Sequence, residues 1–447
     1  MENKYPLLEA REKTDGFEKK LLKDFPESTL VVIRANIPGE KKGCIESCLI
    51  VYKIFSECEK KVKPLKIFHS YTNEEGLIFF LIVKTNPYLL KNLTVQIEEE
   101  HFLGRLADID VLTSDKLFSR ADLKISGRDI TLRKCFLCGE PAAFCARSLR
   151  HSKNEIINFI NKKVYFDFLK GSLTDKLASF AEAAMLTELC RIYGFGCVTA
   201  NGKGSHSDMD FLLMLKCIPL AGNSVRNLTL KECASFSELR NYGKKTELEL
   251  FNLTNGVNTY KGAFFLLLIL NACVYRLIHR GKSFNYLSEE IKKFSREVKK
   301  DFELKNCSEV SLNTFLTVGD FGIRGEVLSG LDFYFKTLLP MLKDALNTDY
   351  GKTGLNVEPK ITVEKIVLKL ISETCDTTVI KRKGYEKLKE LQKKAKAVLS
   401  SPESVFDLQC ARLSSWCEKE NISTGGSADR LIVLYNLFLL EKFFAYL

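Results

Sequence analysis

The pattern of apolar residues changes near residue 165 of this 447-residue chain. Before that point, apolar runs of strand length, such as GLIFFLIVKT (76–85) and LADIDVLT (106–113), alternate with amphipathic helix-like segments. After it, long helical patterns dominate and no low-complexity linker intervenes. We therefore expect two domains joined by a helix-to-helix connection, an α+β domain over 1–165 and a mainly all-α domain over 166–447.

Composition indicates a folded protein, since 45% of the residues are hydrophobic and 28% are charged. Fifteen cysteines lie scattered through apolar, helix-like segments. The first residues are polar and charged, unlike a signal peptide, so we expect reduced thiols in a cytoplasmic protein. The longest apolar run, 262–275, is shorter than the roughly 20 residues of a transmembrane helix, which predicts a buried helix and no membrane partner.

Positive charge is concentrated in one segment of the first domain. The net charge is +11, and residues 116–153 hold nine basic but only three acidic residues. Such a segment suits phosphorylated ligands, nucleic acid or an acidic protein.

Two aspartates precede this basic segment. Asp108 and Asp110 lie two apart on an apolar background, and such residues share one face of a strand. A carboxylate pair of this kind can hold Mg²⁺ bound to a diphosphate or triphosphate. The alternative is a loop aspartate beside a helix cap. Arginines downstream suit phosphate contacts or, alternatively, form a solvated basic face; they are Arg120, Arg128 and Arg133.

The basic segment also contains C-x2-C-x6-C-x5-H, formed by Cys135, Cys138, Cys145 and His151. Three cysteines and a histidine form a legitimate tetrahedral zinc set, and the first pair has metal-ligand spacing. Two other interpretations remain open. The thiols could form a nucleophilic site, or Cys145 could be a small buried residue and His151 a phosphate or surface contact.

Taken together, G-R-L-A-D-I-D-V (104–111), Ser119-Arg120, R-K-C-x2-C-x6-C-A-R and His151-Ser152 resemble the apo-citrate lyase phosphoribosyl-dephospho-CoA transferase family. The resemblance covers about residues 5–165. It implies transfer of 2'-(5''-phosphoribosyl)-3'-dephospho-CoA to a serine of the citrate lyase acyl carrier protein, the gamma subunit, with release of pyrophosphate. Asp108 and Asp110 would then be catalytic metal ligands, and three arginines would bind the nucleotide: Arg105, Arg120 and Arg133.

The second domain carries short polar boxes at helix starts. Glycines let backbone amides approach phosphate, and acids can hold a metal, although Asp and Ser also cap helices. The boxes hold Gly204, Ser205, His206, Asp208 and Asp210; Glu247, Asn258 and Lys261; Asp320, Arg324 and Glu326; Asp376, Lys381 and Arg382; and Gly425, Gly426, Ser427 and Asp429. Five such boxes on one helical scaffold predict convergence on one site.

From about residue 172 onward, G-S-H-x-D-M-D, G-V-N-T-x-K-G, R-G-E, D-T and G-G-S-A-D resemble the triphosphoribosyl-dephospho-CoA synthase family. This implies that ATP and 3'-dephospho-CoA give 2'-(5''-triphosphoribosyl)-3'-dephospho-CoA and adenine. Asp208 and Asp210 would hold Mg²⁺–triphosphate. Lys261 would bind phosphate, with further nucleotide contacts from Gly204, Ser205, His206, Asn258, Arg324, Gly425, Gly426 and Ser427. Glu247 or Glu326 would activate the attacking hydroxyl.

The chain departs from the second family at three places. YGFGCV (193–198) stands for the usual PKPGLV, Tyr260 for histidine, and Asp376-Thr377-Thr378 for DTN. We nevertheless expect an active bifunctional enzyme. The alternatives are that one activity alone is retained, a phosphopantetheinyl transferase with a helical appendage, or a zinc-knuckle nucleic-acid-binding protein. The last would favour more aromatics among the basic residues than Phe136 and Phe144, so we expect no nucleic-acid partner.

Overall fold

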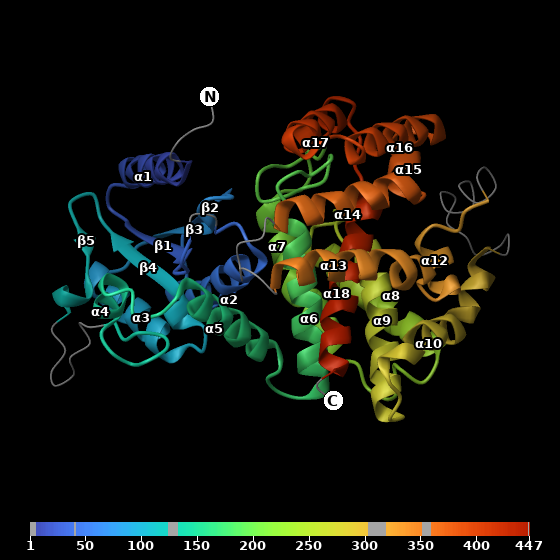
Figure 1. Cartoon of the computed structure of the whole chain (residues 1–447), viewed down its shortest axis with the longest axis horizontal. Coiled ribbons are helices and arrows are strands. Elements are labelled where there is room, and N and C mark those ends of the chain that lie inside the picture. The colour runs from blue at the N-terminus through green and yellow to red at the C-terminus, as the bar shows by residue number, and fades with distance from the viewer. Residues whose placement is uncertain (1–5, 40–41, 124–132, 303–318, 351–358, 446) are drawn as a thin grey trace. The chain divides into compact units, whose positions relative to one another are not determined.

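The computed structural model describes residues 6–39, 42–123, 133–302, 319–350, 359–445 and 447. The chain divides into two compact units, the first ending at Leu169 and the second beginning at Lys170. Figure 1 shows that the first unit combines helices with a sheet and that the second is mostly helical. This confirms the predicted α+β and all-α classes. The domain boundary predicted at 165/166 falls within helix α5 (Lys153–Phe168).

The first unit is built on a five-stranded antiparallel sheet with the strand order β2-β3-β1-β4-β5. The strands are β1 (Thr29–Ala35), β2 (Lys66–Thr72), β3 (Gly76–Val83), β4 (Ala107–Leu112) and β5 (Leu117–Phe118). The helices are α1 (Pro6–Asp24), α2 (Ile45–Val62), α3 (Pro87–Glu100), α4 (Ala142–Arg147) and α5, with short 3₁₀ turns η1 (Gly104–Leu106) and η2 (Arg120–Asp122).

Helices cover both faces of this sheet. Successive strand side chains point to opposite faces, and every residue of β3 is buried, so both faces are apolar and need cover. On β3, Phe80 packs edge-on against Phe17 of α1, whereas its neighbour Phe79 stacks on Phe55 of α2. The face toward α1 also contains Val32, which lies opposite both Phe80 and Asp110 in the strand register. The α1 face is therefore the one that carries the aspartate pair.

The second unit is a helical bundle around α6 (Leu173–Leu189), α9 (Lys261–His279) and α18 (Gly425–Phe444), which pack against one another. The surrounding helices are α7 (Phe211–Arg226), α8 (Phe236–Leu253), α10 (Leu287–Phe294), α12 (Ile323–Ser329), α13 (Leu339–Tyr350), α14 (Pro359–Glu373), α15 (Thr377–Lys383), α16 (Tyr385–Leu399) and α17 (Glu403–Lys419). Short turns of other helical types complete it: η3 (Phe284–Tyr286), η4 (Ser295–Phe302) and η5 (Tyr334–Leu338).

Helix α9 contains the apolar run singled out in the sequence. It is the one helix in the described ranges that is long and apolar enough to cross a membrane. Most of its residues are buried against α18, α8 and α10, as in the core helix of a bundle. The prediction of a buried helix at 262–275 is therefore confirmed.

Candidate active sites in the two units

Asp108 and Asp110 lie on the same face of β4, and their side chains are less buried than those of the alternate residues. Arg34 of β1 lies directly opposite Asp108, and its Nη2 atom donates to Glu18 of α1 over 2.6 Å. Burial, followed by the charge of Asp108, raises the pKa of Asp110, although Arg34 acts against this. Such a pair is suited to receive a cation.

Two charged residues that were not predicted from the sequence bind the free backbone edge of β4. Because β5 pairs only with Val111 and Leu112, Ile109 has no strand neighbour on that side. Its N–H instead donates to Glu98 Oε1 at 3.0 Å, and its carbonyl accepts from Lys91 Nζ at 2.9 Å. Both side chains are buried in the fold, and burial lowers the pKa of Lys91. They form the hydrogen bonds that a neighbouring strand would otherwise make with Ile109, and so hold β4 in place.

Each of the three predicted nucleotide-binding arginines contacts Glu98 or Glu99 of α3, and one of them also contacts Asp108. Arg133 donates to Glu98 at 2.7 Å and to Asp108 at 2.6 Å. Arg120 contacts Glu98 and Glu99, and Arg105 lies 3.2 Å from Glu99. Arg120 is nearly buried, with 9% of its side chain exposed, whereas Arg133 keeps 29%. Nucleotide binding by these residues stays a prediction; Arg133 lies nearest the aspartate pair. Arg128 lies outside the described residues.

Two further cations on the α1 side were also missed. Arg34 belongs to the strand TLVVIRA, where a charged residue in an otherwise apolar run marks a polar position on a buried face. The pKa of Lys42 is lowered by burial and by Arg11, and Arg34 lowers it further, while Glu75 and Asp108 act in the opposite direction. The position of Arg34 could have been recognised from the sequence. The surroundings of Lys42 could not, because they are formed by residues that are distant in the sequence.

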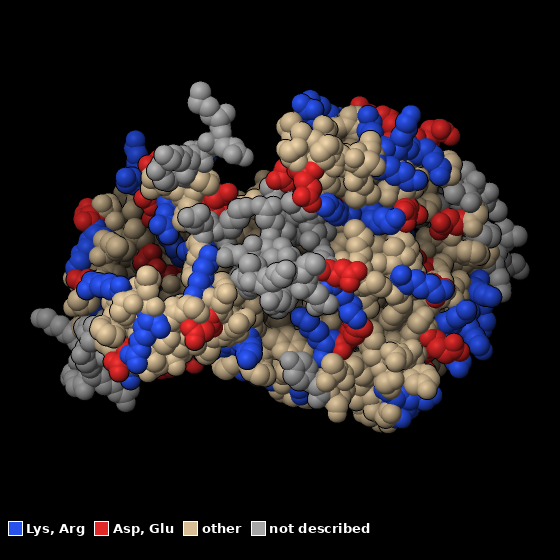
Figure 2. Space-filling view, in the orientation of Figure 1, with Lys and Arg blue, Asp and Glu red and all other residues tan. Residues whose placement is uncertain are grey.

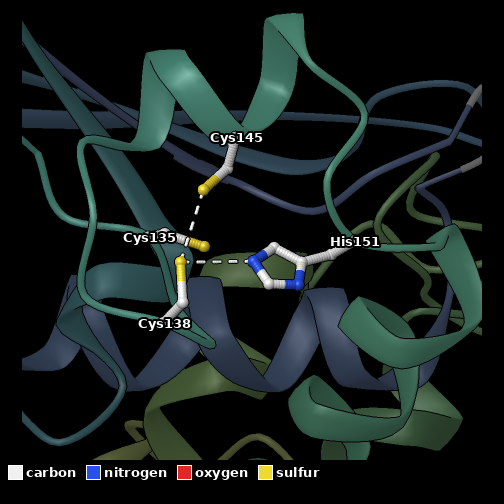
Figure 3. A group of neighbouring side chains, drawn as sticks. All are labelled: Cys135, Cys138, Cys145 and His151. Atoms are coloured by element: carbon white, nitrogen blue, oxygen red, sulfur yellow. Dashed lines mark hydrogen bonds between the residues drawn. The ribbon is translucent and has the colours of Figure 1, made fainter.

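The four predicted zinc ligands lie together in Figure 3. Cys135 and Cys138 come from one turn, Cys145 from α4 and His151 from the segment before α5. Their ligand atoms all lie within 4.8 Å of one another. The Cys138 and Cys145 sulfurs are 3.4 Å apart, and His151 Nε2 lies 3.3 Å from Cys138 Sγ. The cluster predicted from spacing therefore exists in the fold, whatever it binds.

In the second unit, the Gly204–His206 box packs against the segment before α18. Ser205 Oγ donates to the carbonyl of Ile422 at 2.6 Å, and His206 Nε2 lies 2.9 Å from Ser423 Oγ. Arg382 approaches His206 Nδ1 at 3.1 Å, so three boxes meet here. Gly204 has φ +56°, and a Cβ there would lie 2.4 Å from a backbone carbonyl oxygen. Glycine is thus required by backbone packing, independently of any ligand.

The two aspartates of this box have different surroundings. Asp210 is the N-cap of α7, since its Oδ1 accepts from the N–H of Leu213 at 3.0 Å. Asp208 keeps 56% of its side chain exposed and lies 3.7 Å from His206 Nδ1. Helix capping, the alternative considered for such residues, is therefore realised at Asp210. Metal binding by either residue stays a prediction.

At the start of α18, the backbone N–H groups that were predicted to bind phosphate donate to the carboxylate of Asp376. It accepts from the N–H of Ser427 at 2.9 Å, from Ser427 Oγ at 3.0 Å and from the N–H of Gly426 at 3.3 Å. It also caps α15 through the N–H of Thr378 at 3.0 Å. One buried carboxylate thus ties two helix N-termini together. Phosphate binding by Gly425, Gly426 and Ser427 stays a prediction.

Next to this cap lies a buried group of charges. Glu326 accepts from Arg430 and, at 2.8 Å, from the Tyr334 hydroxyl. Burial, followed by Asp376 and Glu188, raises the pKa of Asp429 well above its usual value, and the Ala263 N–H acts against this. Asp429 belongs to the predicted box at the start of α18, whereas the neighbouring Arg430 was not predicted, although a charged residue inside an apolar helix is a recognisable signal.

The start of α9 joins the same region. A Cβ on Gly262 would lie 2.0 Å from Asp429 Oδ2, so glycine is needed for this approach. Lys261 forms an ion pair with Glu247, while Asn258 is exposed in the preceding turn. Tyr260 is buried, and its hydroxyl has no hydrogen-bond partner among the described residues. Arg324 lies 3.2 Å from Asp301. The boxes therefore lie close together, but several of their charged groups already have protein partners.

Charged side chains are interspersed on the surface. Figure 2 shows Lys and Arg alternating with Asp and Glu over the visible face of each unit. The coloured residues of this face form no single large patch of one sign. The positive charge of the sequence is therefore partly balanced locally, as it is around Glu98.

Comparison with known proteins covers both units. Residues 4–165 match the family model described as apo-citrate lyase phosphoribosyl-dephospho-CoA transferase, and residues 174–445 match that described as ATP:dephospho-CoA triphosphoribosyl transferase. Protein CitXG of Leuconostoc mesenteroides subsp. cremoris is 28% identical over 96% of each chain. Protein CitXG of Haemophilus influenzae is 26% identical, over 97% of this chain and 95% of that relative. The 2-(5''-triphosphoribosyl)-3'-dephosphocoenzyme-A synthase of Haemophilus ducreyi is 24% identical, over 68% of this chain and 98% of that relative.

Proposed function

Because this chain belongs to the ATP:dephospho-CoA triphosphoribosyl transferase family and, in its first unit, to the apo-citrate lyase phosphoribosyl-dephospho-CoA transferase family, we propose that it makes and attaches the prosthetic group of citrate lyase. The observation that carries this proposal is that two families with consecutive reactions match the chain almost from end to end. The product of the second unit is the substrate of the first.

The second unit catalyses the synthesis. The ribose 2'-hydroxyl of 3'-dephospho-CoA attacks C1' of the ATP ribose, adenine leaves, and the triphosphate stays on the transferred ribose. The centre is oxocarbenium-like, so a carboxylate should take the hydroxyl proton and others should stabilise positive charge. Glu247 and Glu326 are the predicted candidates. Asp429 is a third, because its carboxylate lies against Gly262, next to Lys261 at the start of α9, and its pKa is raised.

The first unit catalyses the transfer. A serine hydroxyl of the apo acyl carrier protein attacks the phosphate next to the ribose, and pyrophosphate leaves. This reaction needs a cation at the phosphates and fixed positive charge for the leaving group. Asp108 and Asp110 would hold Mg²⁺. Arg133, which already contacts Asp108, would face the pyrophosphate together with Arg34.

The finer assignments belong to the same proposal. Mg²⁺ accompanies ATP at Asp208 and Asp210, the acceptor is the gamma subunit of citrate lyase, and the reactions take place in the cytoplasm. The first unit also carries the Cys135–His151 cluster, whose donor set suits Zn²⁺ in a role outside the transfer chemistry.

Two assays on the full chain test the two steps separately. With ATP, Mg²⁺ and 3'-dephospho-CoA, adenine should accumulate, and its absence from a folded preparation would refute the synthase step. With the triphosphoribosyl product and apo acyl carrier protein, mass spectrometry should detect one added phosphoribosyl-dephospho-CoA group on a serine. An unmodified carrier, with adenine release intact, would refute the transferase step and support only the synthase activity.

A further inference from the structure

The Cys135–His151 cluster has the composition and geometry of a closed metal site. We propose that Cys135, Cys138, Cys145 and His151 bind one Zn²⁺, and that this ion holds residues 133–152 so that Arg133 stays beside Asp108. The ion would be structural, because all four positions are filled by protein ligands and none is left for substrate.

The distances fit this ion. Tetrahedral Zn²⁺ with bonds of about 2.3 Å to sulfur and about 2.0 Å to nitrogen places neighbouring donors roughly 3.5–3.8 Å apart. The Cys138–Cys145 sulfur distance of 3.4 Å and the His151–Cys138 distance of 3.3 Å need only small adjustments. All four donors, not one pair, lie within 4.8 Å of each other. A disulfide would account for two sulfurs but not for the approach of His151 and the third sulfur.

The local backbone forms a tight turn that carries the first two ligands. The turn closes through Gly139 at φ +75° and through the hydrogen bond from Cys135 N to the carbonyl of Glu140 at 2.6 Å.

The charge around the cluster is also complementary. Three thiolates and Zn²⁺ leave a net charge of −1. Cations that adjoin the cluster in sequence can compensate this charge; they are Lys134, Arg147, Arg150 and Lys153. This gives part of the basic segment a role in stabilising a metal centre.

The ion would join the turn at 135–138, α4 and the start of α5; the turn and α4 are otherwise linked by a β-bridge between Lys134 and Pro141. Arg133 lies two residues before the first ligand, and its side chain reaches Asp108 at 2.6 Å and Glu98 at 2.7 Å. His151 directly precedes Ser152, the N-cap of α5. Because short segments of this kind lack a core of their own, loss of the ion should release Arg133 from the aspartates.

The first test is the metal content of the full chain. Purified with its thiols reduced, the protein should contain about one zinc per chain. Replacement by Co²⁺ should give the visible absorption of tetrahedral cobalt with thiolate ligands. Zinc below about a tenth of an ion per chain after growth in zinc-rich medium would overturn the proposal. So would a Cys138–Cys145 disulfide in the freshly purified protein.

Variants then test the role of the ion. His151→Ala should lose the zinc and lower the transfer rate about 10- to 100-fold. His151→Cys, which restores a four-ligand set, should recover both. Cys58→Ala, at a buried cysteine of α2 outside the cluster, should keep the zinc. Adenine release by the same chain should stay unchanged in each variant, which reports that the second unit is folded and active.

The two parts of the proposal fail separately. Full zinc content in His151→Ala would overturn the ligand set. Loss of zinc with an unchanged transfer rate would overturn the positioning of Arg133. The positioning part rests on the proposed transferase function, whereas the metal content does not. A wild-type chain that binds zinc but never modifies the carrier would therefore contradict the function and leave the metal site standing.

Discussion

Two aspartate pairs with the same spacing, Asp108–Asp110 and Asp208–Asp210, lie in different local structures. In the first unit the pair belongs to β4, and the strand alternation turns both carboxylates toward α1. In the second unit the pair precedes α7, where Asp210 caps the helix and Asp208 is largely exposed. The same three-residue pattern thus gives a shared face in one unit and two separate positions in the other.

The difference lies in the local structure that holds each carboxylate pair. On β4 the strand spacing brings like charges together on one face, and Glu98, Lys91 and the surrounding arginines keep that strand in place. Before α7 one of the two carboxylates already stabilises a helix end, so its oxygen has a partner without any ligand. A D-x-D motif therefore places both carboxylates on one face when it lies on a strand, but not when it lies at a helix start.

The largest expected effect comes from the strand pair. Asp110→Asn should lower the transfer of the group to the carrier protein on the order of 10³-fold, because loss of a metal carboxylate removes several kcal/mol of transition-state stabilisation. Asp115→Asn, at an exposed aspartate just beyond β4, is the matched control and should leave the rate unchanged. Mass spectrometry of the carrier measures both. An Asp110→Asn chain as fast as the control would remove the first pair from the site.

The next effect concerns the support of that pair. Glu98→Gln should destabilise the first unit by about 3 kcal/mol, because it leaves Arg120 and Arg133 without their buried partner. Glu99→Gln, in the neighbouring half-exposed glutamate, should cost less than about 1 kcal/mol. Hydrogen exchange of β4 peptides across a urea series measures both. Equal effects would mean that Glu98 acts as an ordinary surface charge.

For the helix-start pair we expect a smaller loss of activity. Asp208→Asn and Asp210→Asn should each slow adenine release about 10- to 100-fold at low Mg²⁺ if both carboxylates hold the Mg²⁺–triphosphate. Higher Mg²⁺ should recover part of the rate, because the weakened site is then refilled. If Asp208→Asn slows the reaction and Asp210→Asn does not, the second aspartate is a cap and nothing more.

Local patterns predicted much of the fold. The run 76–85 contains β3, the run 106–113 contains β4, and the apolar run 262–275 lies in α9, because each buries its side chains with the period of its element. The gathering of the four cluster residues was also predictable from spacing, since they are close in sequence.

The partners of the charged site residues were not predictable in this way. Ser427 donates to Asp376, 51 residues away, and His206 meets Ser423, 217 residues away. A glycine-rich helix start can bind phosphate or a protein carboxylate, and the local sequence is the same in both cases. Arg120 and Arg133 could likewise bind a phosphate or a protein carboxylate. In the fold both contact Glu98, which belongs to α3. Tertiary packing decides which anion is bound.

The smallest effect isolates the cap itself. Asp210→Ala should lower the free energy of unfolding by about 1 kcal/mol, whereas Asp210→Asn should change it little, because asparagine caps as well as aspartate. Ser235→Ala is the matched control, since Ser235 caps α8 through the N–H of Glu238 at 3.2 Å. Adding Mg²⁺–ATP then separates the two roles, because a ligand stabilises the fold more when it binds more tightly. The ligand-induced rise in melting temperature should shrink in Asp210→Asn and stay intact in Ser235→Ala. An undiminished rise in Asp210→Asn would mean that the aspartate pair of the second unit, unlike that of β4, contributes one metal ligand instead of two.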